Sequence, residues 1–361
     1  MDMDLQQAAL TCARSVYGDV GLVAWVPLAE RKRATIARMA LLTDAGARTV
    51  VAKSGAVRER AALEVLTEAG VEGVPRLLAV HDDPPLILME DLGAGPSLAD
   101  RLLGDDRPAA VAAVEAWAVA VARLQTATTA LGPAFRERLA ALDPAAATDQ
   151  TPLVIAEAID DFARLMPELD VVFDDDAAGD LHAIGERLRV DPEAVAGPGA
   201  MTPGDACPDN NIETGNGLVL IDLEWAEFRH VAWEAAYLAV PWPTCWCSWR
   251  MPPEVTAAAI GRWRDALAPH LTDGSGLDDA VRDATVAWSL MTATWLLPAA
   301  LGHEPADGGP RPAPRPTVQN RLAVAAEVAA DGPLRRFAVD LLAATGRAWG
   351  DQPLPLGPAW R

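Results

Sequence analysis

One window of the chain, MTPGDACPDNNIETGNGLVLIDLEWAEF, combines acidic residues and an amide at short spacing. Asp205 and Asn210 are five positions apart, and the apolar run LVLI then leads to Asp222. An acidic residue can take the proton of an attacking hydroxyl, while an amide and a carboxylate can hold Mg²⁺ against nucleotide phosphates. This spacing indicates phosphoryl transfer. The alternative is a local turn in which Asp209 and Asn211 only cap the backbone.

These residues resemble two motifs of the aminoglycoside phosphotransferase and choline kinase superfamily, which has a protein-kinase-like fold. The family loop H-G-D-x-x-x-x-N stands here as P-G-D-A-C-P-D-N, and the family motif I-D-F/W-x stands as I-D-L-E. The resemblance implies that Asp205 is the catalytic base and that Asn210 and Asp222 are metal ligands. The family histidine is replaced by Pro203, which we expect to affect the rigidity of the loop more than the class of reaction.

The preceding part of the chain supplies further elements in the family order. Residues 38–42 and 49–52 are predicted to be short strands joined by a turn, and a helix follows the second strand. In the family, a strand lysine contacts the nucleotide phosphates and pairs with a glutamate of the next helix. By position these are Lys53 and Glu59, with Glu64 as the other candidate partner. The alternative for Glu59 is a surface charge in the run R-E-R.

Two more strands, residues 74–80 and 85–92, precede a helix for which Ser97 is the expected N-cap. The resemblance places the hinge between the lobes at the end of the second strand. There the backbone from Glu90 to Leu92 would bind the nucleotide base.

The stretch that corresponds to the phosphate loop, residues 27–35, contains no glycine. Arg31, Lys32 and Arg33 would contact phosphates through their charge, or they form a solvated basic turn. The sequence leaves both interpretations open.

The chain has 361 residues, a net charge of −21 and a hydrophobic fraction of 51%. Its length is sufficient for two lobes with a large core. The negative charge argues against nucleic acid as a partner, which would need a basic footprint, and is compatible with a cationic acceptor. The acidic N-terminal segment does not resemble a signal peptide, so we expect a cytoplasmic protein.

The four cysteines, Cys12, Cys207, Cys245 and Cys247, lack the spacing of a metal site, and reduced thiols are expected. The uncharged segment Ala284–Leu301 approaches the length of a membrane span. It contains hydroxyl residues and a proline and has no flanking basic residues. We therefore predict a buried helix in the larger lobe and no membrane as a partner.

Beyond residue 92 the apolar periodicity is mainly helical, and the low-complexity stretch 302–316 is expected to be an exposed loop. The predicted fold class is α+β, a bilobal protein-kinase-like fold. Residues 1–92 would form a small antiparallel-sheet lobe with the hinge at its end. Residues 93–361 would form a larger helical lobe with the catalytic loop and the substrate site. The helices expected in this lobe span residues 107–131, 152–169, 177–190, 318–330 and 333–349.

Substrate specificity is expected after Asp222, where residues 237–250 contain three tryptophans within eight positions. They would form an aromatic wall for a flat or cationic substrate, or they anchor a loop in the core. Glu234 lies where the family carries an acidic residue that supports the catalytic loop. Acidic candidates for contact with a cationic substrate are Asp209, Glu213, Glu224 and Glu227.

Together these features predict an ATP- or GTP-dependent, Mg²⁺-dependent phosphotransferase acting on a hydroxyl of a small molecule, aminoglycoside-like or choline-like. Two alternatives remain: a kinase-like enzyme that phosphorylates Ser or Thr of a peptide, and a catalytically silent nucleotide-binding relative. The silent relative would explain Pro203 and the glycine-free loop. The expected partner is a small-molecule acceptor, and the sequence leaves open whether this acceptor is cationic. The expected oligomeric state is a monomer or homodimer.

Overall fold

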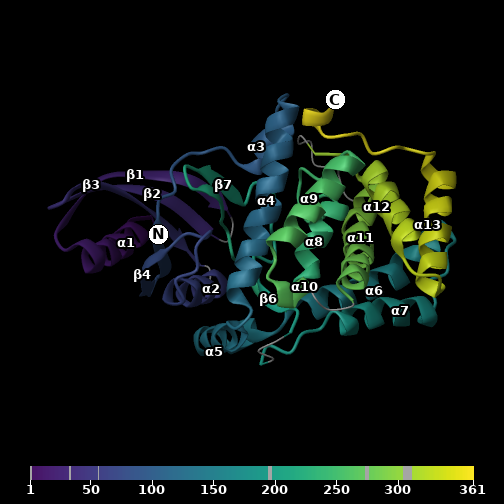
Figure 1. Cartoon of the computed structure of the whole chain (residues 1–361), viewed down its shortest axis with the longest axis horizontal. Coiled ribbons are helices and arrows are strands. Elements are labelled where there is room, and N and C mark those ends of the chain that lie inside the picture. Colours follow the sequence, from purple (N-terminus) through teal and green to yellow (C-terminus); the bar gives the residue numbers. More distant parts are fainter. Residues whose placement is uncertain (1, 32–33, 56, 194–196, 273–275, 304–310) are drawn as a thin grey trace.

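An antiparallel sheet forms the N-terminal part of the molecule and helices form most of the rest (Figure 1). The computed structural model describes residues 2–31, 34–55, 57–193, 197–272, 276–303 and 311–361. Within these residues, five strands pair in the order β1-β2-β3-β5-β4. Their bounds are β1 Val20–Arg31, β2 Ala34–Thr43, β3 Gly46–Ser54, β4 Leu77–Asp82 and β5 Pro85–Glu90. The predicted strands 38–42, 49–52, 74–80 and 85–92 lie largely within β2 to β5, whereas β1 was not expected.

The two faces of this sheet contact different parts of the chain, because successive side chains of a strand point to opposite sides. Met39, Val50 and Leu88 are buried in a cluster with helix α1, Asp2–Tyr17, which covers one face. On β3, Lys53 follows the buried Ala52 and therefore belongs to the opposite face. This face packs against the helical part of the molecule, so the sheet directs Lys53 toward the region of the predicted catalytic loop.

Helix α2, Val57–Glu68, follows β3 directly. Its residues Ala61, Ala62 and Leu66 are buried in the same core cluster as the C-terminal helices. This burial fixes the rotation of the helix. Glu59 lies three residues before Ala62 and seven before Leu66, on the same face of the helix, and is also buried, with 1% of its surface exposed. It is therefore not one of the surface charges of the R-E-R run.

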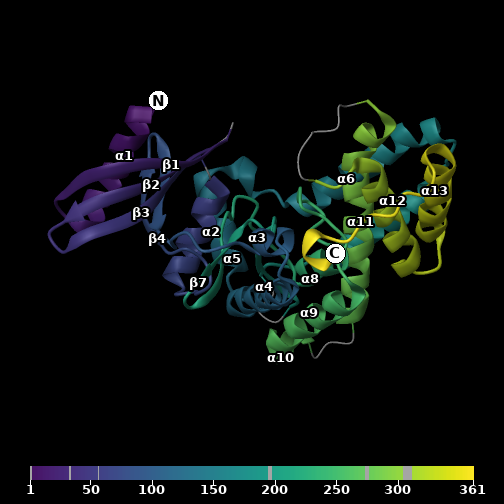
Figure 2. The ribbon, with the colours of Figure 1, turned by 90° about the horizontal axis from the view of Figure 1, so that it is seen from above.

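The long helix α4 lies between the sheet and helices α8, α9, α11, α12 and α13 in both views (Figures 1 and 2). Helix α3 begins after Ser97, whose side chain forms a reciprocal capping box with Asp100, as expected. The predicted helices overlap α4, α6, α7, α12 and α13, while α5, α8, α9 and α10 were not expected. The bounds are α3 Leu98–Leu103, α4 Arg107–Thr128, α5 Gly132–Leu142, α6 Gln150–Leu165, α7 Asp175–Arg187, α8 Ala232–Ala239, α9 Pro253–Ala266, α10 Pro269–Thr272, α11 Leu277–Leu301, α12 Pro314–Val328 and α13 Pro333–Trp349.

Helices α4 and α11 are long and apolar enough to cross a membrane by length and composition alone. Half of the apolar window of α4 and 72% of that of α11 are buried inside the protein, as in core helices. The predicted buried helix at Ala284–Leu301 is thus part of α11. Of the expected exposed loop at 302–316, residues 304–310 lie outside the described residues, and residues 314–316 belong to the start of α12.

The predicted α+β architecture, a small antiparallel-sheet lobe followed by a larger helical lobe, is confirmed. Two short hairpin-like pairs interrupt the helical part between α7 and α8. Strand β6, Gly199–Thr202, pairs with β9, Glu227–His230, and β7, Asn211–Thr214, pairs with β8, Gly217–Leu220. These four strands position the residues of the predicted catalytic motifs.

Candidate active site

The loop that carries Asp205 and Asn210 connects β6 to β7. Its geometry requires glycine at position 204, because Gly204 has φ +76° and an added Cβ would lie 1.8 Å from the carbonyl oxygen of Trp225. The Nδ2 of Asn210 donates to the carbonyl of Asp205 at 2.9 Å and closes the loop. This bond uses the amide nitrogen, so the amide oxygen is the atom that a metal would bind.

The β7–β8 hairpin brings Asn210 to the start of the second motif. Asn211 pairs with Leu220, and the backbone N–H of Ile221 donates to the carbonyl of Asn210 at 3.0 Å. Asp222 is the residue after Ile221 and therefore lies close to Asn210 in space. Asp222 has φ +63°, a left-handed conformation that is uncommon for residues other than glycine and is enriched at functional sites.

Lys53 joins the sheet to this hairpin. Its Nζ lies 2.5 Å from Glu59 Oε2, forms an ion pair with Asp222 and lies 4.0 Å from Glu224. Burial alone would lower the pKa of Lys53, but Glu59 and Asp222 outweigh this effect and raise it, so the amine stays charged. Glu64, the other candidate partner, instead pairs with Arg60 and Arg138.

Asp205 lies in an environment suited to proton transfer. Burial raises the pKa of its carboxyl, and the negative charges of Asp209, Asp222 and Glu224 raise it further. A hydrogen bond of 2.6 Å from the hydroxyl of Thr244 to Oδ1 acts in the opposite direction. Perturbed carboxyl groups of this kind occur at catalytic sites as well as in structural networks.

A buried ion pair supports the loop. Arg229 Nη2 lies 2.5 Å from Glu234 and donates to the carbonyl of Gly204 at 3.3 Å. The hydroxyl of Tyr237 donates to the same carbonyl at 3.2 Å. Burial opposes the charge of Arg229, but Glu234 and Glu227 outweigh it and raise its pKa. Glu234 thus acts on the loop through Arg229. These contacts hold the loop that follows Pro203.

The cysteines differ from the prediction. Cys207, within the loop, forms a disulfide with Cys245, and their Cα atoms are 5.8 Å apart. Cys12 and Cys247 are free and buried. The expectation of reduced thiols is therefore wrong for Cys207 and Cys245. Cys207 and Cys245 are 38 residues apart in the sequence. They meet because the chain folds back on itself, and the spacing of the cysteines in the sequence does not show this.

The remaining predicted nucleotide contacts lie farther from this cluster. Glu90 Oε1 accepts the backbone N–H of Arg76 at 2.9 Å, and the N–H of Glu90 donates to the carbonyl of Arg76. Glu90 and Leu92 line a hollow of about 1400 Å³ beside α4. Their side chains therefore do not join the Lys53 cluster, and the proposed base contact through their backbone stays a prediction. Lys32 and Arg33 lie outside the described residues, as does the side chain of Arg31.

A cavity of about 350 Å³ opens from Asp205. Trp225, Trp288 and Trp295 supply its aromatic surfaces, and Trp225 and Trp295 are each 41% exposed. The other lining residues are Gln150, Thr151, Val154, Glu157, Gly204, Glu227, Arg229, Thr244 and Met291. This cavity is the candidate acceptor site.

The tryptophans of segment 237–250 do not line this cavity, to which that segment contributes Thr244. Trp242 is 1% exposed and packs edge-on against Trp117 at 5.9 Å. Trp246 donates its Nε1 to Asp209 at 2.9 Å. These contacts agree with a loop anchored in the core, and the aromatic wall comes from other parts of the chain.

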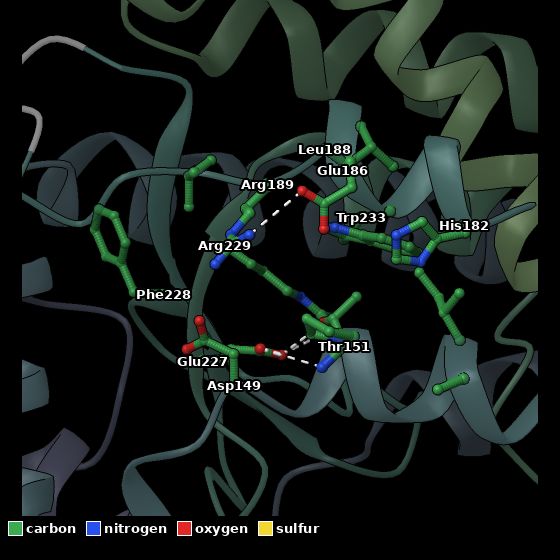
Figure 3. A pocket seen from close by; sticks show the side chains of 15 residues that line it. Asp149, Thr151, His182, Glu186, Leu188, Arg189, Glu227, Phe228, Arg229 and Trp233 are labelled. Atoms are coloured by element: carbon green, nitrogen blue, oxygen red, sulfur yellow. Dashed lines mark hydrogen bonds and ion pairs between the residues drawn. The ribbon is translucent and has the colours of Figure 1, made fainter. Parts of the chain in front are cut away.

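A smaller cavity of about 120 Å³ lies between α6, α7 and β9 (Figure 3). It shares Thr151, Glu227 and Arg229 with the acceptor cavity. Glu227 accepts the hydroxyl of Thr151 at 2.7 Å and the backbone N–H of Gln150 at 2.9 Å, so it caps the N-terminus of α6.

Of the four acidic candidates for substrate contact, Glu227 alone borders the acceptor cavity, and its carboxylate is used to cap α6. Asp209 binds Trp246, Glu213 pairs with Arg101, and Glu224 lies near Lys53.

Sequence reasoning did not single out several residues of the site: Thr244, Tyr237, Arg229, Trp225, Trp288 and Trp295. Tyr237 and Thr244 lie in the segment 237–250 that was expected to set specificity, but neither was assigned a role. Trp288 and Trp295 are seven residues apart on α11, a spacing that places them on one face of the helix, whereas Trp225 and Arg229 carry no local signal.

No protein-family model and no curated protein matches the chain. Solved structures with a similar course of the chain include a choline/ethanolamine kinase family protein from Mesorhizobium loti, at 13% identity and a TM-score of 0.49, covering 95% of this chain and 98% of that one. The choline kinase LicA from Streptococcus pneumoniae has 12% identity and a TM-score of 0.46, with 94% and 99% covered. A thermostable mutant of the aminoglycoside phosphotransferase APH(4)-Ia, in a ternary complex with ADP and hygromycin B, has 12% identity and a TM-score of 0.41, with 92% and 97% covered. These similarities concern the course of the chain and say nothing of its activity.

Proposed function

We propose that this protein transfers the γ-phosphoryl group of ATP or GTP to a hydroxyl group of a small molecule, in a Mg²⁺-dependent reaction. The observation that carries this proposal is the convergence of two groups of residues on the β7–β8 hairpin. Lys53, Glu59 and Asp222 form one buried charge cluster, and Asp205 and Asn210 form the adjoining loop. Phosphoryl transfer requires mainly positioning and charge stabilisation.

Each residue of the cluster has a distinct proposed role. Lys53, oriented by Glu59, would hold the phosphates of the donor. Asn210 and Asp222 supply the hard oxygen ligands that suit Mg²⁺. When bound, Mg²⁺ would neutralise charge on the phosphate oxygens. Asp205 would accept the proton of the attacking hydroxyl, and its raised pKa favours this role.

The shape of the acceptor cavity supports a small molecule rather than a peptide. Its volume of about 350 Å³ lies within the range of about 300–1000 Å³ for small-molecule sites. The exposed rings of Trp225 and Trp295 offer surfaces for a flat or cationic group. Glu157 and the net charge of −21 would favour a cation. The requirement for ATP or GTP also agrees with a cytoplasmic location.

The experiment that tests this proposal is a screen of hydroxyl compounds with Mg²⁺ and either ATP or GTP, including cationic and neutral members. A product would gain about 80 Da, one phosphoryl group. Asp205→Asn is the matched variant, because it removes the base but keeps the size of the side chain. We expect it to lower transfer by about 100-fold or more and to leave nucleotide affinity unchanged. Near-native transfer by Asp205→Asn would contradict the proposed role, and the absence of both transfer and Mg²⁺-dependent nucleotide binding in the wild type would contradict the function.

A further inference from the structure

Three consecutive residues, Thr244–Trp246, contact the loop 205–210 at three alternate positions. We call this segment the clip. The outer two contacts are hydrogen bonds of 2.6 and 2.9 Å, and the middle one is a disulfide. The contacting pairs are Thr244 with Asp205, Cys245 with Cys207, and Trp246 with Asp209. The clip therefore follows the loop along its length and joins it covalently at the centre.

The hydroxyl of Thr244 has a single proton, which it donates to Asp205 Oδ1. Its oxygen lies 3.2 Å from the hydroxyl oxygen of Tyr237, whose one proton faces two acceptors, this oxygen and the carbonyl of Gly204. Tyr237 is fully buried and also contacts the carbonyl of Gly204. The Thr244 hydroxyl thus contacts Tyr237 on one side and donates its hydrogen bond to Oδ1 of Asp205 on the other. Oδ2 is then the oxygen that would receive the proton of the acceptor.

We propose that Thr244 positions the Asp205 carboxylate for phosphoryl transfer and that the Cys207–Cys245 disulfide holds Thr244 in place, so that reduction of this bond slows the reaction. This inference rests on the proposed function and adds a means of regulation to the same site. Thr244 is a positioning residue, because it acts through Asp205.

The chemistry of the change is thiol–disulfide exchange with a dithiol. The dithiol supplies two electrons and two protons, its sulfurs become a disulfide, and Cys207 and Cys245 become thiols. Two thiol sulfurs cannot remain at the bonded distance of about 2 Å, so the clip and the loop must separate. Cys207 Sγ lies 3.2 Å from Asp205 Oδ1. Once protonated, it can donate a hydrogen bond to the same oxygen as Thr244 and compete for it.

The disulfide lies close to residues of the acceptor cavity. Cys207 and Cys245 are 5% and 9% exposed, but Thr244 and Asp205, which adjoin them, line the acceptor cavity. In a reducing compartment, disulfides are usually catalytic or redox-sensing rather than purely structural. A disulfide that joins a catalytic loop to the residue positioning its base fits this use.

The test compares turnover of oxidised and dithiothreitol-reduced protein in wild type, Thr244→Val, Thr244→Ser and Cys12→Ala. Valine keeps the shape of threonine without its hydroxyl, and serine keeps the hydroxyl. Cys12, a free cysteine of α1 in the sheet lobe, provides the matched control. Circular dichroism and thermal melting establish that each form is folded.

We expect Thr244→Val to lower kcat by about tenfold with little change in the KM for nucleotide, and Thr244→Ser to restore most of the rate. Reduction should lower kcat in the wild type and in Cys12→Ala by a similar factor. It should have little further effect in Thr244→Val, because coupled changes are not additive. A disulfide with only a structural role would shift the melting temperature without this dependence on Thr244.

An active wild type whose kcat is unaffected by both reduction and Thr244→Val would overturn the inference and leave the proposed function intact. If Thr244→Val does not fold, the reduced wild type decides the matter. A folded, reduced wild type with unchanged kcat would also overturn the inference and leave the proposed function intact. If the oxidised wild type shows no phosphoryl transfer to any acceptor and no Mg²⁺-dependent nucleotide hydrolysis, the proposed function fails, and the inference fails with it.

Discussion

Gly204 precedes Asp205, and its replacement by alanine tests how closely the catalytic loop depends on its packing. The residue has φ +76°, in the left-handed region. An added Cβ would lie 1.8 Å from the carbonyl oxygen of Trp225 and 2.5 Å from its carbonyl carbon. Both are backbone atoms, so a change of rotamer cannot relieve the overlap.

Two costs follow from this geometry. The left-handed conformation costs alanine about 1–2 kcal/mol relative to glycine. Ordinary contact begins near 3.4 Å, so the loop or the Trp225 backbone must in addition move by about 1.6 Å. Asp205 is the adjacent residue and would move with the loop. Because a displacement of about 1 Å in an active site can cost about 100-fold in rate, we expect Gly204→Ala to lose at least this factor.

Gly70→Ala is the matched control. Gly70 has φ +67°, and nothing lies within 4 Å of its added Cβ. This variant should show the backbone cost of about 1–2 kcal/mol and keep its turnover. The assays are Mg²⁺-dependent nucleotide hydrolysis, transfer to an acceptor found in the screen, and thermal melting. If Gly204→Ala matched Gly70→Ala in both turnover and melting temperature, the close approach to Trp225 would not constrain the loop as argued.

Three further predictions concern the metal, the tryptophans and pH. Asp222→Ala should abolish the part of nucleotide binding that depends on Mg²⁺, measured by calorimetry with and without the metal; equal ATP affinity in both conditions for the wild type would count against the site. Trp246→Ala should lower the free energy of unfolding by about 3 kcal/mol, whereas Trp295→Ala, at an exposed ring of the cavity, should leave stability nearly unchanged and weaken acceptor binding by about 0.5–2 kcal/mol; the reverse pattern would return the aromatic wall to segment 237–250. Burial lowers the pKa of His230 to about 4 from 6.5, so the unfolded chain takes up a proton near pH 6.5 that the folded chain does not, and stability should fall by about 2 kcal/mol from pH 7 to 5. Urea unfolding of the wild type and His230→Asn at both pH values checks this, and an equal pH dependence in the two proteins would refute it.

The sequence alone predicts the elements of this fold where local patterns are strong. Apolar periodicity identifies α2 and α4, and the Ser97 capping signal locates the start of α3. These patterns are local, because a helix or a cap depends on residues within one or two turns. The N-terminal α1 and β1 were not predicted.

The sequence also identifies Lys53, Glu59, Asp205, Asn210 and Asp222 as members of one site. The structure brings Lys53 to Glu59 and Asp222, and Asp205 to Asn210. Their catalytic and metal-binding roles stay predictions. The motif spacing was informative because it coincides with a short loop and a hairpin, whose register follows from a few residues.

Only the tertiary structure shows which residues support Asp205 and which surround the acceptor cavity. Thr244, Cys245 and Arg229 reach the loop from segments more than twenty residues away in the chain. The walls of the cavity come from α6, α11 and the residues that follow Asp222. Such contacts arise when the helices pack around a common core, and no local periodicity encodes the partner of a side chain across that core. The sequence by itself therefore determined which residues are candidates for the reacting groups, and the packing of distant segments decided how they are held and what they face.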